Sequence, residues 1–141
     1  MSETTIDDEL SSSRLLPQVS EVTRPFWEGG RHGELLLEFC PSCERFTNPP
    51  LGRCPSCEGA VEHRAVSGRG RVFTYTVDHQ PYNPAVPVPY VVALVELDEQ
   101  AGLRVFTNLV GIAPSEVAIG LAVTVRFEDH DPVFVPVFVP A

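Results

Sequence analysis

Four cysteines in one short stretch are the residues of this chain best suited to chemistry. Cys40 and Cys43 form one C-P-S-C motif, Cys54 and Cys57 form a second, and ten residues separate the two motifs. Two residues between paired cysteines let one tight turn present both sulfurs, and four thiolates are the ligands of a tetrahedral structural zinc. A proline after the first cysteine of each motif presets that turn. The spacing therefore predicts a zinc ribbon.

Two other uses of four cysteines fit this spacing. A pair of disulfides needs an oxidising compartment, whereas residues 1–14 are polar and acidic and do not resemble a signal or transit peptide, so we expect a cytoplasmic protein with reduced thiols. Iron in a rubredoxin-like site has the same four ligands, and ligand identity alone does not separate it from zinc. Because four thiolates leave no position open for water, a zinc bound here is expected to be structural rather than hydrolytic.

Motifs of catalysis are missing from the rest of the sequence. The four histidines are scattered, and there is no metalloprotease motif, nucleophile elbow, phosphate-binding loop or dinucleotide-binding fingerprint. All four cysteines are assigned to metal, and all ten basic residues are arginine, so no lysine can form a Schiff base with a carbonyl substrate. We therefore predict no catalytic residue in this chain.

Charge and composition argue against two further classes of function. The formal net charge of −9 argues against a protein that binds the phosphate backbone of nucleic acids. No apolar run approaches the ~20 residues of a membrane-spanning helix. With 141 residues, 43% of them hydrophobic, the chain is expected to form one domain, or one small domain with an appended metal module.

The N-terminal part of the chain is expected to contain little regular structure. Acidic and serine residues at 7–13 predict a disordered tail or linker over residues 1–18. A helical segment is expected within residues 19–38, where Thr23 is a candidate N-cap for a short helix over Arg24–Glu28 that ends at Gly29 and Gly30. Residues 33–39 are ambiguous between helix and strand because their leucines show no clean period. The zinc ribbon is placed at residues 39–66.

In the remaining residues, 67–141, apolar and polar positions alternate with the period of two that is typical of β-strands. Five strands are expected, at 71–79, 90–98, 103–111, 121–129 and 132–140. The proline-rich loop 80–89 can be neither helix nor central strand, and Pro136 fits only an edge or a bulge. A short helical turn is expected within 113–120. Five strands with one helical insertion after the third predict a mainly β protein with a five-stranded Greek-key barrel of the OB type, although another five-stranded sandwich would fit as well.

Two groups of residues are candidates for contacts with other molecules. Arginines are concentrated near the ribbon and its exit, and forked guanidinium donors suit phosphate, so four of them could bind the phosphates of coenzyme A: Arg53, Arg64, Arg69 and Arg71. They could equally be surface residues paired with neighbouring acids. The second group consists of aromatic residues expected at a partner interface: Phe26, Trp27, Tyr82 and Tyr90. The neighbours Phe26 and Trp27 point in different directions on a helix, or both pack on the ribbon.

The order of the motifs resembles a known family. P-F-W (25–27), G-E-L-L-L (33–37) and the two cysteine motifs come first. They are followed by S-G-R-G-R-V-F-T-Y-T-V (67–77), P-Y-V-V-A-L-V-E-L-D (89–98), T-N-L-V-G (107–111) and I-G-L-A-V-T-V-R-F-E (119–128). From about Arg24 to Pro140 the chain resembles the DUF35 family, which consists of OB-fold proteins with a rubredoxin-like zinc ribbon that are associated with acyl-CoA metabolism. One departure is that Glu44 and Glu58 occupy positions where such motifs often have glycine.

The resemblance implies a partner protein rather than a catalyst that acts alone. Family members act beside thiolase-fold enzymes, and the resemblance is to the partner of lipid-transfer-protein-like aldolases that cleave a β-hydroxyacyl-CoA in steroid side-chain degradation. It implies a zinc-containing, non-catalytic subunit of such a lyase complex, in a heterotetramer of two plus two subunits, with a coenzyme A thioester as the substrate of the complex. Alternatives are an accessory subunit of an acyl-CoA hydratase, an acetyltransferase or a hydroxymethylglutaryl-CoA synthase. An alternative of another class is a nucleic-acid-binding OB-fold module.

Overall fold

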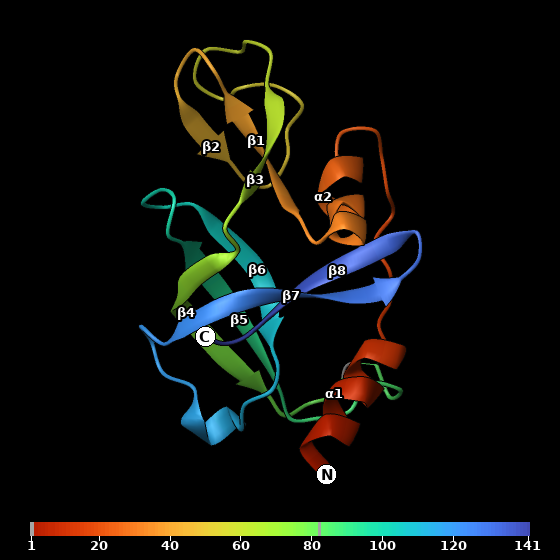
Figure 1. Ribbon diagram of the computed structural model, residues 1–141. Coiled ribbons are helices and arrows are strands. Elements are labelled where there is room, and N and C mark those ends of the chain that lie inside the picture. The colour runs from red at the N-terminus through yellow and green to blue at the C-terminus, as the bar shows by residue number, and fades with distance from the viewer. Residues whose placement is uncertain (1, 82) are drawn as a thin grey trace.

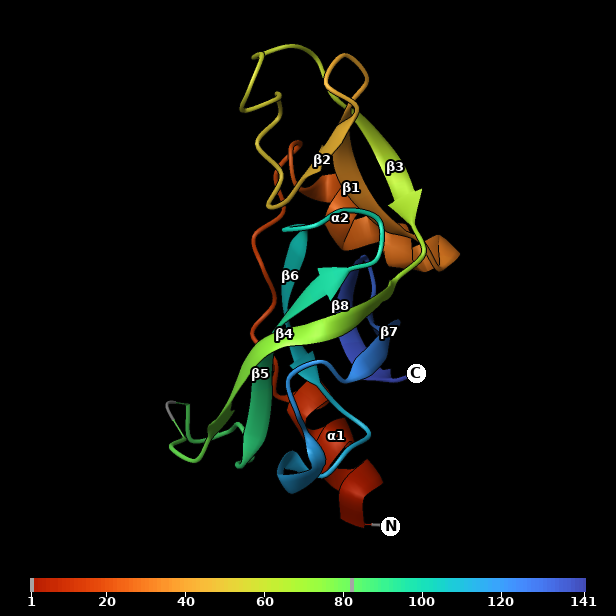
Figure 2. The ribbon, with the colours of Figure 1, turned by 90° about the vertical axis from the view of Figure 1, so that its left-hand side faces the viewer.

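The computed structural model describes residues 2–81 and 83–141 and consists of a small three-stranded sheet above a five-stranded barrel (Figure 1). A view from the side places the small sheet at one end of the molecule and the N-terminal helix at the other (Figure 2). No helix among the described residues combines the length and the apolar character needed to cross a membrane. The four-cysteine ribbon and the closed five-stranded barrel agree with the predicted fold class.

The barrel is closed by five strands that match the five predicted ones. They are β4 (Arg69–Asp78), β5 (Tyr90–Leu97), β6 (Arg104–Leu109), β7 (Ala122–His130) and β8 (Val133–Pro140). Their order around the barrel is β4-β5-β6-β8-β7, which is the OB topology. A 3₁₀-helix, η2 (Pro114–Glu116), occupies the predicted helical insertion after the third barrel strand. Pro136 pairs with Phe127 of β7, at a point where β8 has no ladder partner on β6.

Alternation of side chains along the strands builds the barrel core. In β5 every second residue from Val91 to Leu97 is buried, while the residues between them face outwards and are half-buried. Such a period of two is what the pleat of a strand requires when one face meets a core. A bulge in β4 between Val72 and Thr74 leaves the ring of Phe73 on the outside.

The small sheet contains the cysteine motifs. It consists of β1 (Leu35–Cys40), β2 (Arg45–Thr47) and β3 (Glu62–Val66) in the order β2-β1-β3, so the ambiguous stretch 33–39 is largely a strand. Before it, α2 (Arg24–Glu28) begins as predicted, but the chain continues as a 3₁₀-helix, η1 (Gly29–His32), instead of stopping at the two glycines. Gly30 packs tightly there, because a Cβ atom on it would lie 2.5 Å from the ring of Phe127.

Side-chain hydrogen bonds fix the small sheet to the barrel. The side chain of Gln100, at the β5–β6 turn, accepts a hydrogen bond from the N–H of Phe46 at 2.8 Å and donates one to its carbonyl at 3.0 Å. Asn48 donates to the carbonyl of Arg104 at 2.9 Å. On the opposite side of the joint, the N–H of Ser67 donates to Glu99 at 2.6 Å. These contacts, together with the β3–β4 connection, hold the two modules in one orientation.

The N-terminal segment is structured, which differs from the prediction of a disordered tail over residues 1–18. Residues Ser2–Ser12 form α1, and Leu10 is buried in a second hydrophobic cluster with Val133, Val135 and Val137 of β8. The physical reason lies in β8, whose valines face outwards from the barrel while Phe138 fills its interior. Both faces of this strand are apolar, so the outer face needs a cover.

A buried ion pair fastens this cover. Arg14 binds Glu128 through two hydrogen bonds, from Nε at 2.6 Å and from Nη2 at 3.1 Å, and donates a third to Asn108 at 2.9 Å. His130 lies 3.2 Å from the same carboxylate and 3.4 Å from the hydroxyl of Ser11. The side chain of Glu128 is only 6% exposed, so Arg14 neutralises a charge that water does not reach.

Replacing Arg14 by alanine is expected to lower the free energy of unfolding by about 3 kcal/mol, because it leaves the Glu128 carboxylate buried without its guanidinium partner. The matched control is Arg24→Ala, which removes an arginine from an exposed pair with Glu28. That change should cost less than about 0.5 kcal/mol. Urea unfolding of the two variants measures both values, and equal losses would show that the Arg14 pair does not fasten the segment.

Candidate functional site

The four cysteines converge at the tip of the small sheet. All four sulfurs lie within 4.8 Å of one another, with 3.6 Å between those of Cys40 and Cys57 and 3.9 Å between those of Cys43 and Cys54. A tetrahedron with metal–sulfur bonds of about 2.3 Å has edges of about 3.8 Å, so these distances fit a zinc ion. Cys40 ends β1, and the other three cysteines lie in the two loops that flank β2.

Backbone N–H groups donate hydrogen bonds to the sulfurs. Cys43 donates to the sulfur of Cys40 at 3.3 Å, and Ser56 donates to that of Cys54 at 3.4 Å. The N–H groups of Cys57 and Ser56 lower the pKa of the Cys54 thiol to about 6. Hydrogen bonds to the other three cysteines, Cys57 first, raise the pKa of Cys43 to about 12. Metal ligation requires thiolates, and the Cys54 thiol loses its proton more readily than the Cys43 thiol does.

The two glutamates at the usual glycine positions adopt the backbone that glycine would. Glu44 has φ of 53° and Glu58 has φ of 60°, both in the left-handed region. In each motif the glutamate N–H donates to the carbonyl of the first cysteine, at 2.7 Å for Glu44 and 2.9 Å for Glu58. The turns therefore close without glycine, at the steric cost that a Cβ atom carries in this conformation.

Glu38 is a structural residue of the site that sequence reasoning missed. It lies in β1, is 1% exposed, and accepts hydrogen bonds from the N–H groups of Leu51 and Gly52 at 2.7 and 2.8 Å. This carboxylate holds the loop that leads to the second cysteine motif. The sequence could have indicated this role, because Glu38 is the one acidic residue in the apolar run L-L-L-E-F-C and a buried carboxylate needs hydrogen-bond donors.

The four arginines predicted to bind coenzyme A lie in three parts of the fold, namely a loop, β3 and β4. Arg64 is on β3, where it pairs with Glu62 at 2.7 Å and lies 3.9 Å over the ring of Phe39. Arg53 lies in the loop before the second cysteine motif. Arg69 and Arg71 share one outer face of β4, and Arg71 donates to the carbonyl of Gly120 at 3.0 Å. Arg64 therefore fits the alternative of a surface arginine paired with an acid.

The aromatic residues predicted for a partner interface have different environments. Phe26 is buried in the main core, because α2 packs on the barrel, so it does not belong to an exposed surface. Trp27 remains half-buried and meets Phe26 edge to face at 4.9 Å. Tyr90 is half-buried and donates to Asp78 at 2.8 Å. Tyr82 lies outside the described residues.

Sequence reasoning missed Phe106, which has the largest exposed fraction among the aromatic residues of the barrel that the structure describes. Phe106 is 75% exposed on β6, between the buried residues Val105 and Thr107. The sequence V-F-T-N-L could have revealed it, because a phenylalanine at an outward-facing position of an alternating strand is exposed to solvent. Phe106 lines a pocket of about 430 Å³ together with Trp27.

Replacing Glu58 by glycine in the zinc-loaded protein is expected to stabilise it by up to about 1 kcal/mol, because glycine adopts the left-handed conformation without steric cost. Zinc release to a chelator should slow and the unfolding midpoint should rise. The control is Glu62→Gly in β3, where glycine weakens a strand and should have the opposite sign. Faster zinc loss from the Glu58 variant would contradict the assignment of strain to this turn.

Comparisons with known proteins agree with the two modules. Residues 27–62 match the rubredoxin-like zinc ribbon domain of ChsH2, and residues 63–128 match the C-terminal OB-fold domain of ChsH2. A solved structure described as an Ltp2-ChsH2(DUF35) aldolase is similar, with a TM-score of 0.77 and 38% identity. The match covers 89% of this chain and 98% of that one.

Two curated relatives are longer proteins. One is a probable enoyl-CoA hydratase alpha subunit from Thermomonospora curvata, 43% identical over 82% of this chain and 37% of its own length. The other is the 3-oxo-4,17-pregnadiene-20-carboxyl-CoA hydratase alpha subunit of Mycobacterium tuberculosis, 33% identical over 91% of this chain and 41% of its own length. The chain thus spans less than half the length of either relative.

Proposed function

We propose that this chain, which belongs to the ChsH2 family of DUF35 proteins, is a non-catalytic, zinc-containing subunit of a thiolase-fold acyl-CoA enzyme. The observation that carries the proposal is the similarity to the aldolase structure, since it spans almost the whole of that chain. The sequence supports it as well, because the chain has no lysine and no motif of a nucleophile or general base.

The reaction of the complex is proposed to be the retro-aldol cleavage of a β-hydroxyacyl-CoA from a steroid side chain. Such a cleavage needs a base for the β-hydroxyl proton and donors that stabilise the enolate formed at the thioester. We assign both to the partner and assign assembly to this chain. The steroid class is supported by the name of the mycobacterial relative, which acts on a pregnadiene carboxyl-CoA.

The metal is proposed to be a structural Zn²⁺ bound by the four cysteines. It would hold the two cysteine loops together, with Glu38 fastening the chain between them. A closed set of four thiolates has no position for substrate, so this ion is assigned no step of the reaction.

A second candidate is an accessory subunit of an acyl-CoA hydratase. The names of both curated relatives favour it, since each is a hydratase alpha subunit. In this case too the catalytic residues would lie outside the segment that matches this chain.

Affinity purification of the tagged chain from its native host tests the assembly. A thiolase-fold protein is expected to co-elute in equal amount, as two plus two subunits by light scattering, and the complex should cleave a β-hydroxyacyl-CoA that neither subunit cleaves alone. Co-elution with a hydratase subunit instead would favour the second candidate. Elution of the chain alone, as a zinc-loaded monomer, would contradict both.

Coenzyme A binding is proposed for the arginines on β4, which share one face of the strand. Replacing Arg69 and Arg71 together by alanine in the complex should weaken coenzyme A binding about tenfold, because each guanidinium would donate to a phosphate. Arg24→Ala is the control, since Arg24 lies on α2 and pairs with Glu28. Calorimetric titration measures the affinities, and an unchanged value for the double variant would place the phosphates elsewhere.

A further inference from the structure

The seam that closes the barrel, between β6 and β8, contains very few backbone pairs. Within residues 2–81 and 83–141, the ladder between these two parallel strands consists of the pair Leu109–Phe138 alone. Beside it, the N–H of Val110 donates to the carbonyl of Phe138 at 2.9 Å. By contrast, all six residues of β6 have partners on β5. Towards its N-terminus, β6 is therefore an edge strand on the side of β8, although the barrel is closed.

The direction of the backbone shows which residue of β6 faces this seam. The N–H of Leu97 donates to the carbonyl of Leu103 at 2.9 Å, so these two residues form a hydrogen-bonded pair between β5 and the start of β6. Hydrogen-bonded and non-hydrogen-bonded pairs alternate along an antiparallel ladder, so the partners Leu94 and Phe106 form a non-hydrogen-bonded pair. The N–H and the carbonyl of Phe106 consequently point away from β5 and towards β8.

Pro136 of β8 removes the donor that Phe106 would otherwise meet. The parallel register, continued by two residues, places Thr107 beside Pro136. In such a ladder the N–H of residue 136 would donate to the carbonyl of Phe106. Proline has no N–H, and the carbonyl of Pro136 accepts instead from the hydroxyl of Thr107 at 3.1 Å. In the described ladder, both backbone groups of Phe106 are thus left without a partner on β8.

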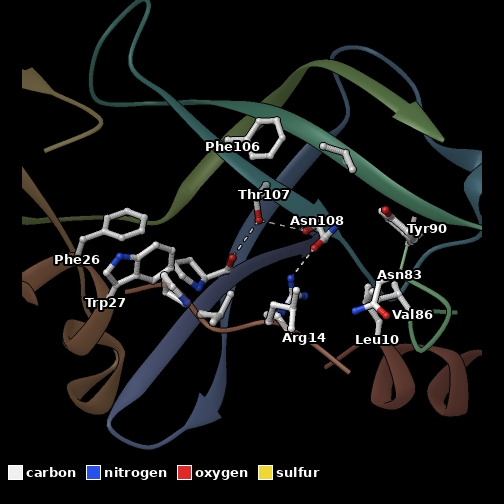
Figure 3. Close-up of a pocket in the computed structure, with 15 residues that line it drawn as sticks. Leu10, Arg14, Phe26, Trp27, Asn83, Val86, Tyr90, Phe106, Thr107 and Asn108 are labelled. Atoms are coloured by element: carbon white, nitrogen blue, oxygen red, sulfur yellow. Dashed lines mark hydrogen bonds between the residues drawn. The ribbon is translucent and has the colours of Figure 1, made fainter. Parts of the chain in front are cut away.

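The pocket of about 430 Å³ spans this seam. Phe106 and Thr107 line it from β6, and Val135 and Pro136 line it from β8. Trp27 of α2 faces the same space (Figure 3). A segment of polypeptide lying in the pocket would therefore reach the backbone of Phe106 from the side that β8 leaves open.

The hydrogen-bonding groups at the seam fit a polypeptide better than a charged ligand. The side chain of Asn108 already donates to the carbonyl of Val91 at 2.9 Å. Arg14, the one cation of the lining, is neutralised by Glu128, and the protein has a net charge of −9. The backbone of Phe106 remains, with one N–H and one carbonyl. A residue of an extended chain presents the same two groups along one edge, in the complementary order.

The N-terminal segment of the chain lies beside this edge without pairing with it. Leu15 and Pro17 line the pocket, but residues 13–18 form no backbone pair with β6 in the described part of the chain. Two apolar side chains at the rim leave most of their surface uncovered, since Phe106 is 75% and Leu15 81% exposed. An incoming segment with apolar side chains would cover part of this surface, which supplies a driving force in addition to the hydrogen bonds.

We propose that β6 accepts an extended, uncharged segment of a partner protein as an added β-strand, antiparallel to it and paired at Phe106. The antiparallel direction follows from the free groups, because only in that direction can one residue exchange both hydrogen bonds with a single partner. Main-chain hydrogen bonds of this kind give affinity in other complexes that add a strand to a sheet edge. The inference does not rest on the proposed aldolase partner.

Amide hydrogen exchange of the zinc-loaded full chain, followed by NMR, tests the free edge. The N–H of Phe106 should exchange about a hundredfold faster than that of Thr107, which faces Ala93 of β5. Titration with acetyl-Val-Thr-Val-Thr-amide, a neutral peptide of high strand propensity, should shift the Phe106 amide signal in a saturable way and slow its exchange. Equal protection of the two amides in the free chain, or no saturable shift at millimolar peptide, would overturn the proposal.

A methylated peptide separates strand addition from apolar binding without pairing. The same peptide with its residues N-methylated keeps the side chains and the carbonyls but has no backbone N–H to donate to Phe106. It should bind about tenfold more weakly or worse, because one of the two hydrogen bonds is lost. Equal affinity for both peptides would show that the pocket does not add a strand.

Two substitutions at one position provide matched variants. Phe106→Thr and Phe106→Pro both remove the ring, but only the proline removes the N–H, which no ladder bond uses. The proline variant should bind the peptide about tenfold more weakly than the threonine variant. Pro136→Val is an independent test, because it gives β8 the missing N–H and should weaken binding by closing the seam. Unchanged affinity in Pro136→Val, or equal affinities in the two Phe106 variants, would overturn the proposal, whether or not the chain assembles with a thiolase-fold enzyme.

Discussion

The two apolar faces of β8 are the constraint on which much of this structure depends. One face supplies Phe138 to the barrel interior, and the other presents Val133, Val135 and Val137 to the outside. A strand in this position must be covered on both faces, and its outer face is covered by α1 through Leu10 and by α2 through Trp27. The ion pair of Arg14 and Glu128 follows from that arrangement, as does the pocket, which is the part of this interface that the cover leaves unfilled.

In the ribbon, the free energy of metal binding is balanced against the strain of the backbone turns that present the cysteines. Sulfur–sulfur distances near those of a tetrahedron are reached with glutamates in left-handed turns and with a buried carboxylate beneath the loop. Glu44 and Glu58 therefore carry the steric cost of a left-handed backbone and place one carboxylate at the surface of each turn. Metal ligation, which is worth far more than one strained residue, can sustain this arrangement.

The sequence predicted the parts of the fold that repeat a pattern. Alternation gave five barrel strands within a few residues of β4 to β8, and the cysteine spacing gave the ribbon. The sequence did not predict features that depend on partners far away in the chain. The polar segment around Arg14 was predicted to be disordered, because its ion-pair partner Glu128 lies 114 residues away. The same limit applies to Phe26, which is buried because α2 packs against the barrel, a contact that the helix sequence by itself does not show.

The hydrogen bonds between Gln100 and Phe46 have a consequence for association. They tie the tip of a barrel hairpin to the edge of the ribbon, and Ser67 with Glu99 ties the other side of the joint. A protein that contacts both modules therefore meets a surface whose halves are already aligned, and little interdomain freedom is lost on binding. The ribbon therefore enlarges the surface of the barrel in a fixed orientation and does not move as a separate domain on a flexible linker.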